Sequence, residues 1–400
     1  MHKIIITTQT CIKKTYVALH LKEDAAADLE IAPLEETATE SIGTICIGKI
    51  KDIQPKLHGM FVDIQKGKTC YMDLRSLSDT WFVKRARAEQ ITQGDELVVQ
   101  IKRERTGNKF PIVSGQLEFA GAYLVLTNEA KGVGYSKKLS AETKKRLQSL
   151  PFVSKFEGSL IFRTNAESAT DEELTKEFAQ LSASYRKLSS EYRYRTCYSV
   201  LKEPELFFMP MLSHIRFEEL EQIIVDQPVL YQKLQEKFQD IPEMLDKLSF
   251  FDKKTENSYG LNARYSINSL IEHALQERVW LKSGAYLIIQ PTEAMTVIDV
   301  NSGKNEGKKK QKDYFFRINL EAATEIARQL RLRNISGICV VDFINLTSKE
   351  EEQQLLSYMS GLLKDDPVSA QAIDITSLGL MEITRKKQKK SLREQLEYCS

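Results

Sequence analysis

Two aspartates, each near the end of an apolar run, constrain the fold of this 400-residue chain more than any other feature. The run TVIDV contains Asp299, and the run ICVVDFI contains Asp342. Between them, residues 320–332 have the apolar periodicity of a helix, with Asn319 as its N-cap. A strand–helix–strand unit places its strands in parallel, so we expect both carboxylates at the same edge of one sheet.

These carboxylates form a candidate metal site. A charged group in an apolar strand is costly unless it is paired or bound to a metal. Asn301 follows Asp299 by two residues and adds an amide oxygen at the same edge. Such oxygens suit Mg²⁺, which could support phosphodiester cleavage. Two alternatives stay open: strand ends that are merely capped, and an enzyme acting on sugar phosphates or nucleotide phosphates at the same edge.

The N-terminal part of the chain has the pattern of short β-strands. Residues 38–118 contain alternating runs separated by glycines, which predicts a small closed barrel of the OB type. Phe61 and Tyr71 lie on neighbouring runs, and Lys109 follows the last one. Exposed rings there would stack on unpaired bases, and the lysine would neutralise a phosphate. The alternative is that both rings belong to the barrel core.

The periodicity and the charge change along the rest of the chain. Residues 167–250 show helical periodicity. The formal net charge is only +2, but residues 101–163 carry 12 basic and 5 acidic side chains. Such a block favours an anionic ligand held in one place, and the alternative is a solvated lysine-rich surface.

The cysteines and the hydropathy pattern indicate a cytoplasmic protein. The six cysteines are scattered without a CxxC pair, as in proteins of reducing compartments. No segment approaches the about 18–20 apolar residues of a membrane span. The first residues contain too few apolar side chains for a signal peptide.

The run VIDVNSGK and the later run INLEAATEIARQLRLRNISGICVVDFINL resemble the signature of the ribonuclease E/G family of bacterial endoribonucleases. The segments IGKIKDIQPKLHGMFVDI, GNKFPIVSGQLEFAGAYLVL and LGLMEITRKK extend the resemblance over nearly the whole chain. It implies a multidomain protein of the α+β and α/β classes. The implied parts are an RNase H-like subdomain (1–37 and 167–278), an inserted S1 RNA-binding barrel (38–118), a 5′-sensor region (119–166) and a DNase I-like catalytic subdomain (279–400).

The resemblance also implies a role for each matching residue. Asp299 and Asp342 would hold the catalytic Mg²⁺, and Asn301 would orient the site. The RNA-binding residues of the S1 barrel would be Phe61, Tyr71 and Lys109. The pocket for a 5′-monophosphate would comprise Gly121, Val125, Arg163 and Thr164. Without the resemblance, Arg163 would read as a surface arginine at a strand end.

The implied activity is Mg²⁺-dependent cleavage of single-stranded RNA, in rRNA and tRNA processing and mRNA decay. It would leave a 5′-phosphate and a 3′-hydroxyl, with a preference for 5′-monophosphorylated substrates. The competing interpretation is a non-catalytic RNA-binding or ribosome-associated protein.

The resemblance also raises the question of a zinc-linked homodimer. Many members share one Zn²⁺ between protomers through a CPxC-type motif after the C-terminal helix, whereas this sequence ends at Cys399 and Ser400. One cysteine per protomer would supply two thiolates, fewer than the four ligands of a closed zinc site. The sequence therefore leaves the homodimer and the zinc link open.

Overall fold

The computed structural model describes residues 1–11, 14–34, 41–84, 91–105, 109–212, 214–254, 259–303, 314–344 and 348–399, with the backbone alone for residues 398 and 399. The chain forms two compact units. The first consists of residues 1–34 and 218–400, and the second consists of residues 35–217.

The first unit contains a five-stranded sheet in the order β15-β14-β1-β2-β3. Its strands are β1 (His2–Gln9), β2 (Thr15–Lys22), β3 (Ala25–Pro33), β14 (Leu220–Val225) and β15 (Leu248–Phe250). β1 pairs antiparallel with β2 and parallel with β14. The expectation of helical structure throughout residues 167–250 is wrong here, because the buried run of Ile223, Ile224 and Val225 forms a strand beside β1.

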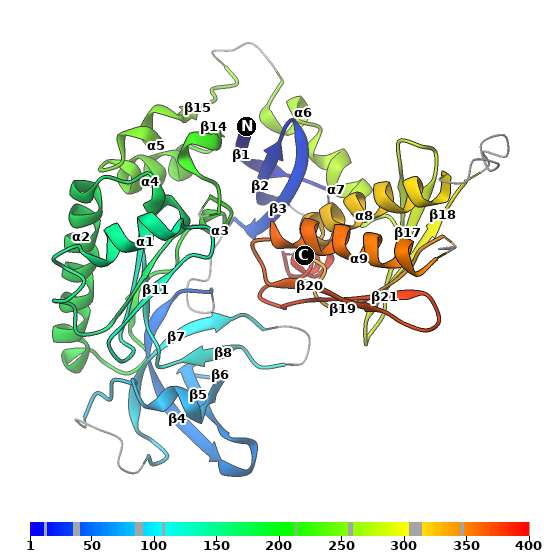
Figure 1. Ribbon diagram of the computed structural model, residues 1–400. Coiled ribbons are helices and arrows are strands. Elements are labelled where there is room, and N and C mark those ends of the chain that lie inside the picture. The colour runs from blue at the N-terminus through cyan, green and yellow to red at the C-terminus, as the bar shows by residue number, and fades with distance from the viewer. Residues whose placement is uncertain are drawn as a thin grey trace. The chain divides into compact units, whose positions relative to one another are not determined.

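Helices cover this sheet (Figure 1). They are α4 (Pro228–Phe238), α5 (Pro242–Asp246), α6 (Leu261–Arg264), α7 (Ile267–Leu275) and α10 (Leu392–Cys399). Ile267 and Ile271 of α7 and Leu392 and Leu396 of α10 share one core with the strands. The last helix of the sequence therefore packs on the first strands.

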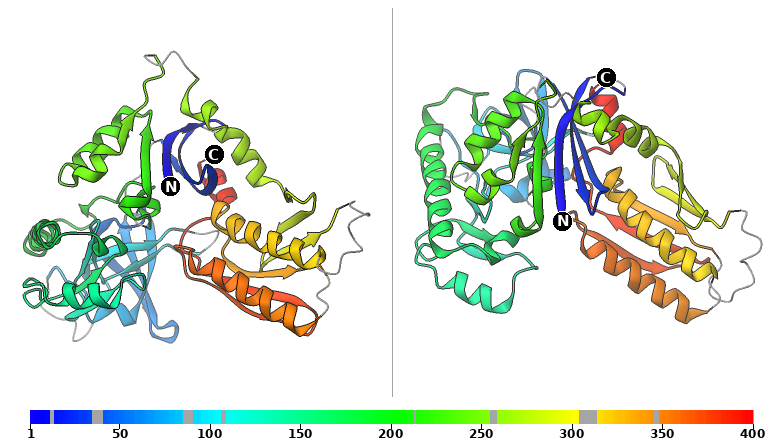
Figure 2. Two further views of the ribbon diagram at one scale, coloured as in Figure 1. Left: turned by 45° about the horizontal axis from the view of Figure 1, so that its top comes forward. Right: turned by 90° about the horizontal axis from the view of Figure 1, so that it is seen from above.

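The first unit also contains a six-stranded sheet in the order β16-β17-β18-β19-β21-β20. This sheet carries Asp299 and Asp342. Its strands are β16 (Arg278–Trp280), β17 (Tyr286–Pro291), β18 (Thr296–Asn301), β19 (Gly337–Asp342), β20 (Ala370–Ile375) and β21 (Leu380–Arg385). Helices α8 (Tyr314–Leu332) and α9 (Lys349–Lys364) lie along one face of it (Figure 2). A core of apolar side chains from both helices and the strands fills the space between them.

The second unit begins with the expected barrel. Its strands are β4 (Ile45–Gln54), β5 (Gly59–Gln65), β6 (Lys68–Asp73), β7 (Glu96–Arg103) and β8 (Ile112–Ser114). They follow the order β4-β5-β6-β8-β7, and β4 also pairs with β7, which closes the sheet. The small closed barrel predicted from the sequence is thus confirmed, and it has five strands. A further strand, β13 (Val200–Lys202), pairs with β4.

A four-stranded sheet completes the second unit, in the order β11-β12-β10-β9. Its strands are β9 (Glu118–Ala120), β10 (Leu124–Thr127), β11 (Gly132–Tyr135) and β12 (Ser159–Phe162). The helices of this unit are α1 (Ala141–Gln148), α2 (Asp171–Glu191) and α3 (Met209–Leu212). The long helix α2 packs against β9 and β10.

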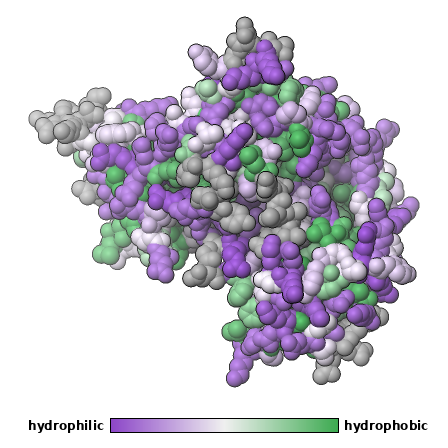
Figure 3. Space-filling model, turned by 180° about the vertical axis from the view of Figure 1, so that it is seen from behind, coloured by the Kyte–Doolittle hydropathy of each residue, from purple (hydrophilic) through white to green (hydrophobic). Residues whose placement is uncertain are grey.

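Hydrophilic side chains predominate on the face of the molecule shown in Figure 3. Within the described ranges, no helix has both the length and the apolar character needed to cross a membrane.

Candidate active site

Asp299 and Asp342 lie opposite each other on adjacent parallel strands. β18 and β19 pair in parallel, and the register places Asp299 directly beside Asp342. Both aspartates are exposed, whereas their neighbours Ile298 and Val341 are fully buried under the helices. This arrangement confirms that the two carboxylates meet at one edge of the sheet.

Asn301 completes the group on the same face of β18. Its amide nitrogen Nδ2 donates a hydrogen bond to Oδ2 of Asp299 at 2.7 Å. Residues two positions apart on a strand project from the same side, which brings the amide to the carboxylate. Asn301 therefore fixes the orientation of the Asp299 carboxylate.

The helix between the two strands is longer than the sequence indicated. α8 begins at Tyr314, so Asn319 lies inside it and is not an N-cap. Asn319 is fully buried and bonds the backbone of Ile344 twice, donating from Nδ2 to the carbonyl oxygen at 2.7 Å and accepting from the amide at 3.0 Å. It thereby anchors the segment that follows Asp342.

The donor set fits Mg²⁺. Within the ranges that the structure describes, no group of three or more histidine, cysteine, aspartate or glutamate side chains could enclose a metal ion. Mg²⁺ does not need such a cage, because it is usually held by one or two carboxylates together with water and substrate phosphates. Two exposed carboxylates in register, one oriented by an amide, match that requirement.

The barrel presents a surface of aromatic side chains. Phe61 and Tyr71 are a cross-strand pair on β5 and β6, with ring centroids 6.1 Å apart. Both rings are partly exposed, so the alternative that they form the barrel core is wrong; the core on these strands contains Met60 and Met72. Lys109 is exposed and lies three residues before β8 in the sequence.

Sequence reasoning missed Phe110 on this surface. Its ring is 44% exposed and lies 5.2 Å from Phe61, centroid to centroid. The guanidinium of Arg105 lies 5.9 Å from the Phe110 ring centroid. The sequence did contain a signal for this residue. Phe110 directly follows Lys109, which the barrel prediction already placed after the last strand of the barrel.

Gly121 and Arg163 are brought into contact in the second sheet of this unit. Nη1 of Arg163 donates to the carbonyl oxygen of Gly121 at 2.5 Å, and the Arg163 amide donates to the Tyr123 carbonyl. Burial lowers the pKa of Arg163, and the charges of Glu205 and Glu177 oppose that shift. The guanidinium is thus a partly buried cation beside the turn after β9.

The two other expected sensor residues lie on or just after strands of the same sheet. Val125 lies on β10, paired with Ala120 and Ile161, and is half-buried. Thr164 follows Arg163 directly, and its Oγ1 lies 2.9 Å from Oγ of Ser136. The hydroxyl is therefore held close to the end of β11.

Glu177 of α2 organises the same turn and was not found from the sequence. Its carboxylate accepts hydrogen bonds from the amides of Ala122, Tyr123 and Leu124 at 2.5, 2.9 and 2.8 Å. Burial raises the pKa of Glu177, and these three bonds oppose the rise. A glutamate three residues after the buried Leu174, on the apolar side of a helix, was the available signal.

Comparison with known proteins decides the family. The model of the ribonuclease E/G family matches residues 118–388. The chain belongs to this family.

Curated relatives extend the match to both units. The chain is 31% identical over 390 residues to ribonuclease E of Synechocystis sp. strain PCC 6803, covering 96% of this chain and 57% of the relative. It is also 31% identical over 371 residues to ribonuclease G of Escherichia coli strain K12, covering 89% of this chain and 74% of the relative. The chain spans little more than half the length of the ribonuclease E relatives.

One expectation from the ribonuclease E/G resemblance concerns the end of the chain. The side chain of Cys399 lies outside the described residues, so the zinc link that the sequence left open stays open.

Proposed function

We propose that this chain is a Mg²⁺-dependent endoribonuclease that cuts single-stranded RNA. Membership of the ribonuclease E/G family supports the reaction class. The observation that carries the proposal is the register of Asp299 beside Asp342 on parallel strands. The four parts expected from the sequence, including the two-segment RNase H-like subdomain and the DNase I-like subdomain, belong to this proposal together with their boundaries.

In the proposed reaction, Asp299 and Asp342 hold the cation and Asn301 keeps Asp299 in the binding orientation. When bound, Mg²⁺ activates water and offsets the charge that develops on the scissile phosphate. Attack of water on phosphorus with departure of the 3′-oxygen leaves a 3′-hydroxyl and a 5′-phosphate. Asn319 keeps the segment after Asp342 in place during this step.

The barrel would hold the strand. Phe61 and Tyr71, with Phe110 beside them, offer ring faces on which unpaired bases stack whatever their sequence. Lys109 would neutralise a backbone phosphate.

The pocket around Arg163 would recognise a 5′-monophosphate. A guanidinium and a hydroxyl, from Arg163 and Thr164, can grip a terminal phosphate with charge-assisted hydrogen bonds. Gly121 and Val125 would form the wall of this pocket. We therefore propose faster cleavage of 5′-monophosphorylated RNA, in rRNA and tRNA processing and mRNA decay.

The test uses one short A/U-rich single-stranded RNA with either a 5′-monophosphate or a 5′-hydroxyl, in Mg²⁺ or in EDTA. Asp299→Asn and Asp342→Asn should each lower the cleavage rate by about a thousandfold, since several kcal/mol of charge stabilisation is lost. Glu382→Gln is the matched control, because Glu382 is an exposed carboxylate in register with Val340 on the same face.

The outcomes separate the competing functions. Mg²⁺-dependent internal cuts that disappear in both aspartate variants support the nuclease. Equal rates on the two RNAs would retain the nuclease and exclude the 5′ sensor. RNA that binds but is never cut would favour the non-catalytic RNA-binding protein instead.

A further inference from the structure

An aromatic cluster with an arginine lies on the sheet that carries the catalytic carboxylates. It consists of Arg278 and Trp280 on β16 and Tyr286 on β17. The Trp280 and Tyr286 ring centroids are 5.2 Å apart, and the Arg278 guanidinium lies 4.7 Å from the Tyr286 ring and 5.6 Å from the Trp280 ring. Trp280 is 63% exposed.

The register places this cluster on the same face as the carboxylates. Trp280 pairs with Tyr286, and Tyr286 pairs with Asn301. Two residues further along the strands, Arg278 pairs with Ile288, and Ile288 pairs with Asp299. Directly paired residues of antiparallel strands project from the same side of a sheet. The cluster and the carboxylates therefore share one surface.

The spacing between neighbouring strands gives the distance from the cluster to Asn301. With strands about 4.8 Å apart, Tyr286 is one strand from Asn301 and Trp280 is roughly 10 Å away. An RNA strand whose phosphate lies at Asp299 and Asp342 can therefore place a nearby base over the cluster.

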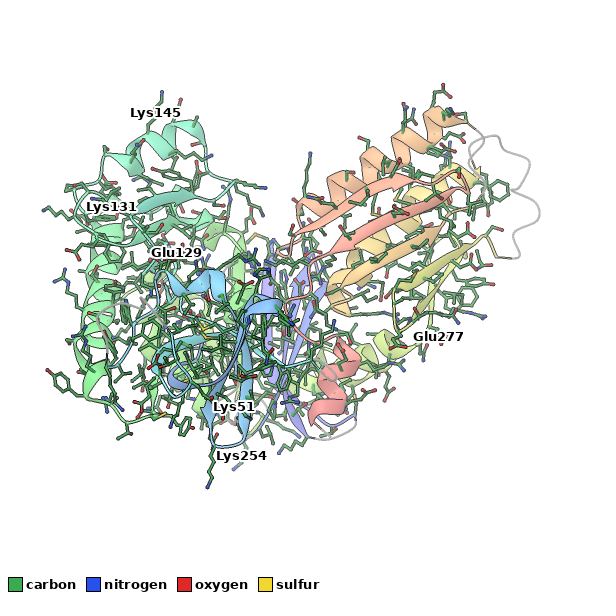
Figure 4. The ribbon with its side chains drawn as sticks, turned by 90° about the horizontal axis from the view of Figure 1, so that it is seen from below. Lys51, Glu129, Lys131, Lys145, Lys254 and Glu277 are labelled. Atoms are coloured by element: carbon green, nitrogen blue, oxygen red, sulfur yellow. The ribbon has the colours of Figure 1, made fainter. Side chains whose placement is uncertain are left out.

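Packing within the unit does not account for these side chains. The buried face of the sheet is covered by α8 and α9, and its core contains neither Arg278, Trp280 nor Tyr286. β16 is a three-residue strand at the edge of the sheet, directly after Glu277 (Figure 4). A large ring that stays mostly in water gains little from burial. Two rings beneath a cation instead match the chemistry of an unpaired nucleotide, which has a flat apolar base and a phosphate.

We propose that Arg278, Trp280 and Tyr286 form a stacking platform for one unpaired base of the RNA, close to the phosphodiester bond that is cut. This inference rests on the proposed nuclease function. Trp280 supplies the outer ring face, Tyr286 supports it, and Arg278 adds positive charge for the phosphate. A paired base cannot offer its face to the ring, so the platform makes the catalytic sheet itself selective for single strands.

A scan with abasic substitutions tests the platform. One RNA with a mapped cut carries an abasic residue at each position in turn. In the wild type, the abasic substitution at one position near the cut should lower kcat/KM by about 5- to 20-fold, as expected for the loss of one stacked base. Trp280→Ala should lower kcat/KM on the intact RNA by a similar factor and make the abasic residue at that position neutral.

Two further variants act as controls. Trp280→Phe keeps a ring face and should retain most of the activity and the sensitivity at that position. Tyr194→Ala removes a ring that is 89% exposed in the other unit, and it should leave the abasic profile unchanged.

Fluorescence gives a readout that a purely structural role would not change. The chain contains two tryptophans, so Trp81→Phe leaves Trp280 as the only indole. In EDTA, the intact RNA should quench the Trp280 emission, and the RNA that is abasic at the sensitive position should not.

The outcomes distinguish this inference from the nuclease proposal. Cleavage by the wild type with an unchanged abasic profile in Trp280→Ala and no quenching would overturn the platform and leave the nuclease standing. Position-dependent quenching without any cleavage would support the platform and reject the nuclease. If Trp280→Ala fails to fold, the quenching of the Trp280 emission in the Trp81→Phe variant decides whether the platform exists.

Discussion

Gly121 lies so close to Glu177 that any side chain on Gly121 would overlap the carboxyl group of Glu177 at its Cβ atom. That carboxyl group also accepts the amide hydrogen bonds of the three residues after Gly121. A buried charge from α2 therefore shapes the turn whose carbonyl oxygen receives the Arg163 guanidinium.

Glu177→Gln should weaken the preference for a 5′-monophosphate. Glutamine has one acceptor oxygen and a donor group where three amides donate, so at least one amide loses its partner, at a cost of about 1–3 kcal/mol. We expect a lower melting temperature and a smaller ratio of the two cleavage rates, with the 5′-hydroxyl rate preserved. Glu172→Gln, at an exposed position of the same helix, is the control. An unchanged ratio and unchanged stability would contradict this role.

Asn319→Ala should reduce both stability and activity. The substitution leaves the Ile344 amide and carbonyl without their buried partner, which costs about 1–3 kcal/mol. Thermal unfolding and cleavage kinetics measure the two effects, and we expect kcat to fall more than KM rises. Arg317→Gln at an exposed position of the same helix should change stability by less than about 0.5 kcal/mol. Equal effects of the two variants would argue against an anchoring role.

Phe110→Ala should weaken RNA binding without unfolding the barrel. The ring is partly exposed and contacts Phe61, so its loss removes a stacking face but little core. We expect Kd for a single-stranded RNA to rise by about 5- to 100-fold. Anisotropy titration measures Kd, and a melting curve checks the fold. Unchanged affinity would remove Phe110 from the binding surface.

Lys109→Ala should change the salt dependence of binding more than its sequence dependence. Loss of one phosphate contact to single-stranded RNA lowers the slope of log K against log salt by about 0.7. The measurement is a series of Kd values for one RNA at increasing KCl. Lys131→Ala is the comparison; Lys131 is labelled in Figure 4, and its Nζ donates to the Ser154 carbonyl. Slopes that fall equally in both variants would show no specific contact at Lys109.

Stability should fall as the pH drops from 6.5 to 4. Nδ1 of His2 lies 2.7 Å from Nε2 of His20, whose Nδ1 lies 2.7 Å from Asp28. Burial, with the charges of His20 and Lys22, lowers the pKa of His2 from 6.5 to about 4. The unfolded state therefore binds more protons in this window, and the free energy of unfolding decreases as the pH falls, by about 2 kcal/mol.

Urea unfolding at pH 4.5 and pH 7 tests the contribution of His2. The loss in the free energy of unfolding between pH 7 and pH 4.5 should be smaller in His2→Gln than in the wild type. If both proteins lose the same stability, the dependence comes from other groups.

The sequence predicted the parts of the fold that depend on local pattern. The apolar runs around Asp299 and Asp342 predicted two neighbouring strands, and the crossover rule predicted their parallel pairing. The runs did not show that each strand is buried on one face only. The start of α8 was missed because Asn319 has the residue type of an N-cap, whereas its side chain serves a distant backbone segment. Such a contact has no local signature.

In the candidate sites, too, contacts between distant segments could not be predicted from the local sequence pattern. Phe61 and Tyr71 follow the strand alternation, but the periodicity does not say which face is covered. Glu177 lies 53 to 55 residues from the amides that it bonds, and only the packing of α2 against β9 and β10 brings them together. Trp280 and Asn301 are separated by a whole strand, so their common row required the observed register.

The position of β1 between β2 and β14 has a consequence for synthesis on the ribosome. The hairpins of β1, β2 and β3 emerge first, yet one edge of β1 has no partner until β14 has been translated, roughly 10–40 s later at about 5–20 residues per second. An unpaired strand edge invites pairing with other chains. The second unit, whose strands all pair within residues 35–217, can finish folding during this interval. The nascent chain must therefore keep its first sheet out of intermolecular contacts until β14, just past the middle of the sequence, has been translated.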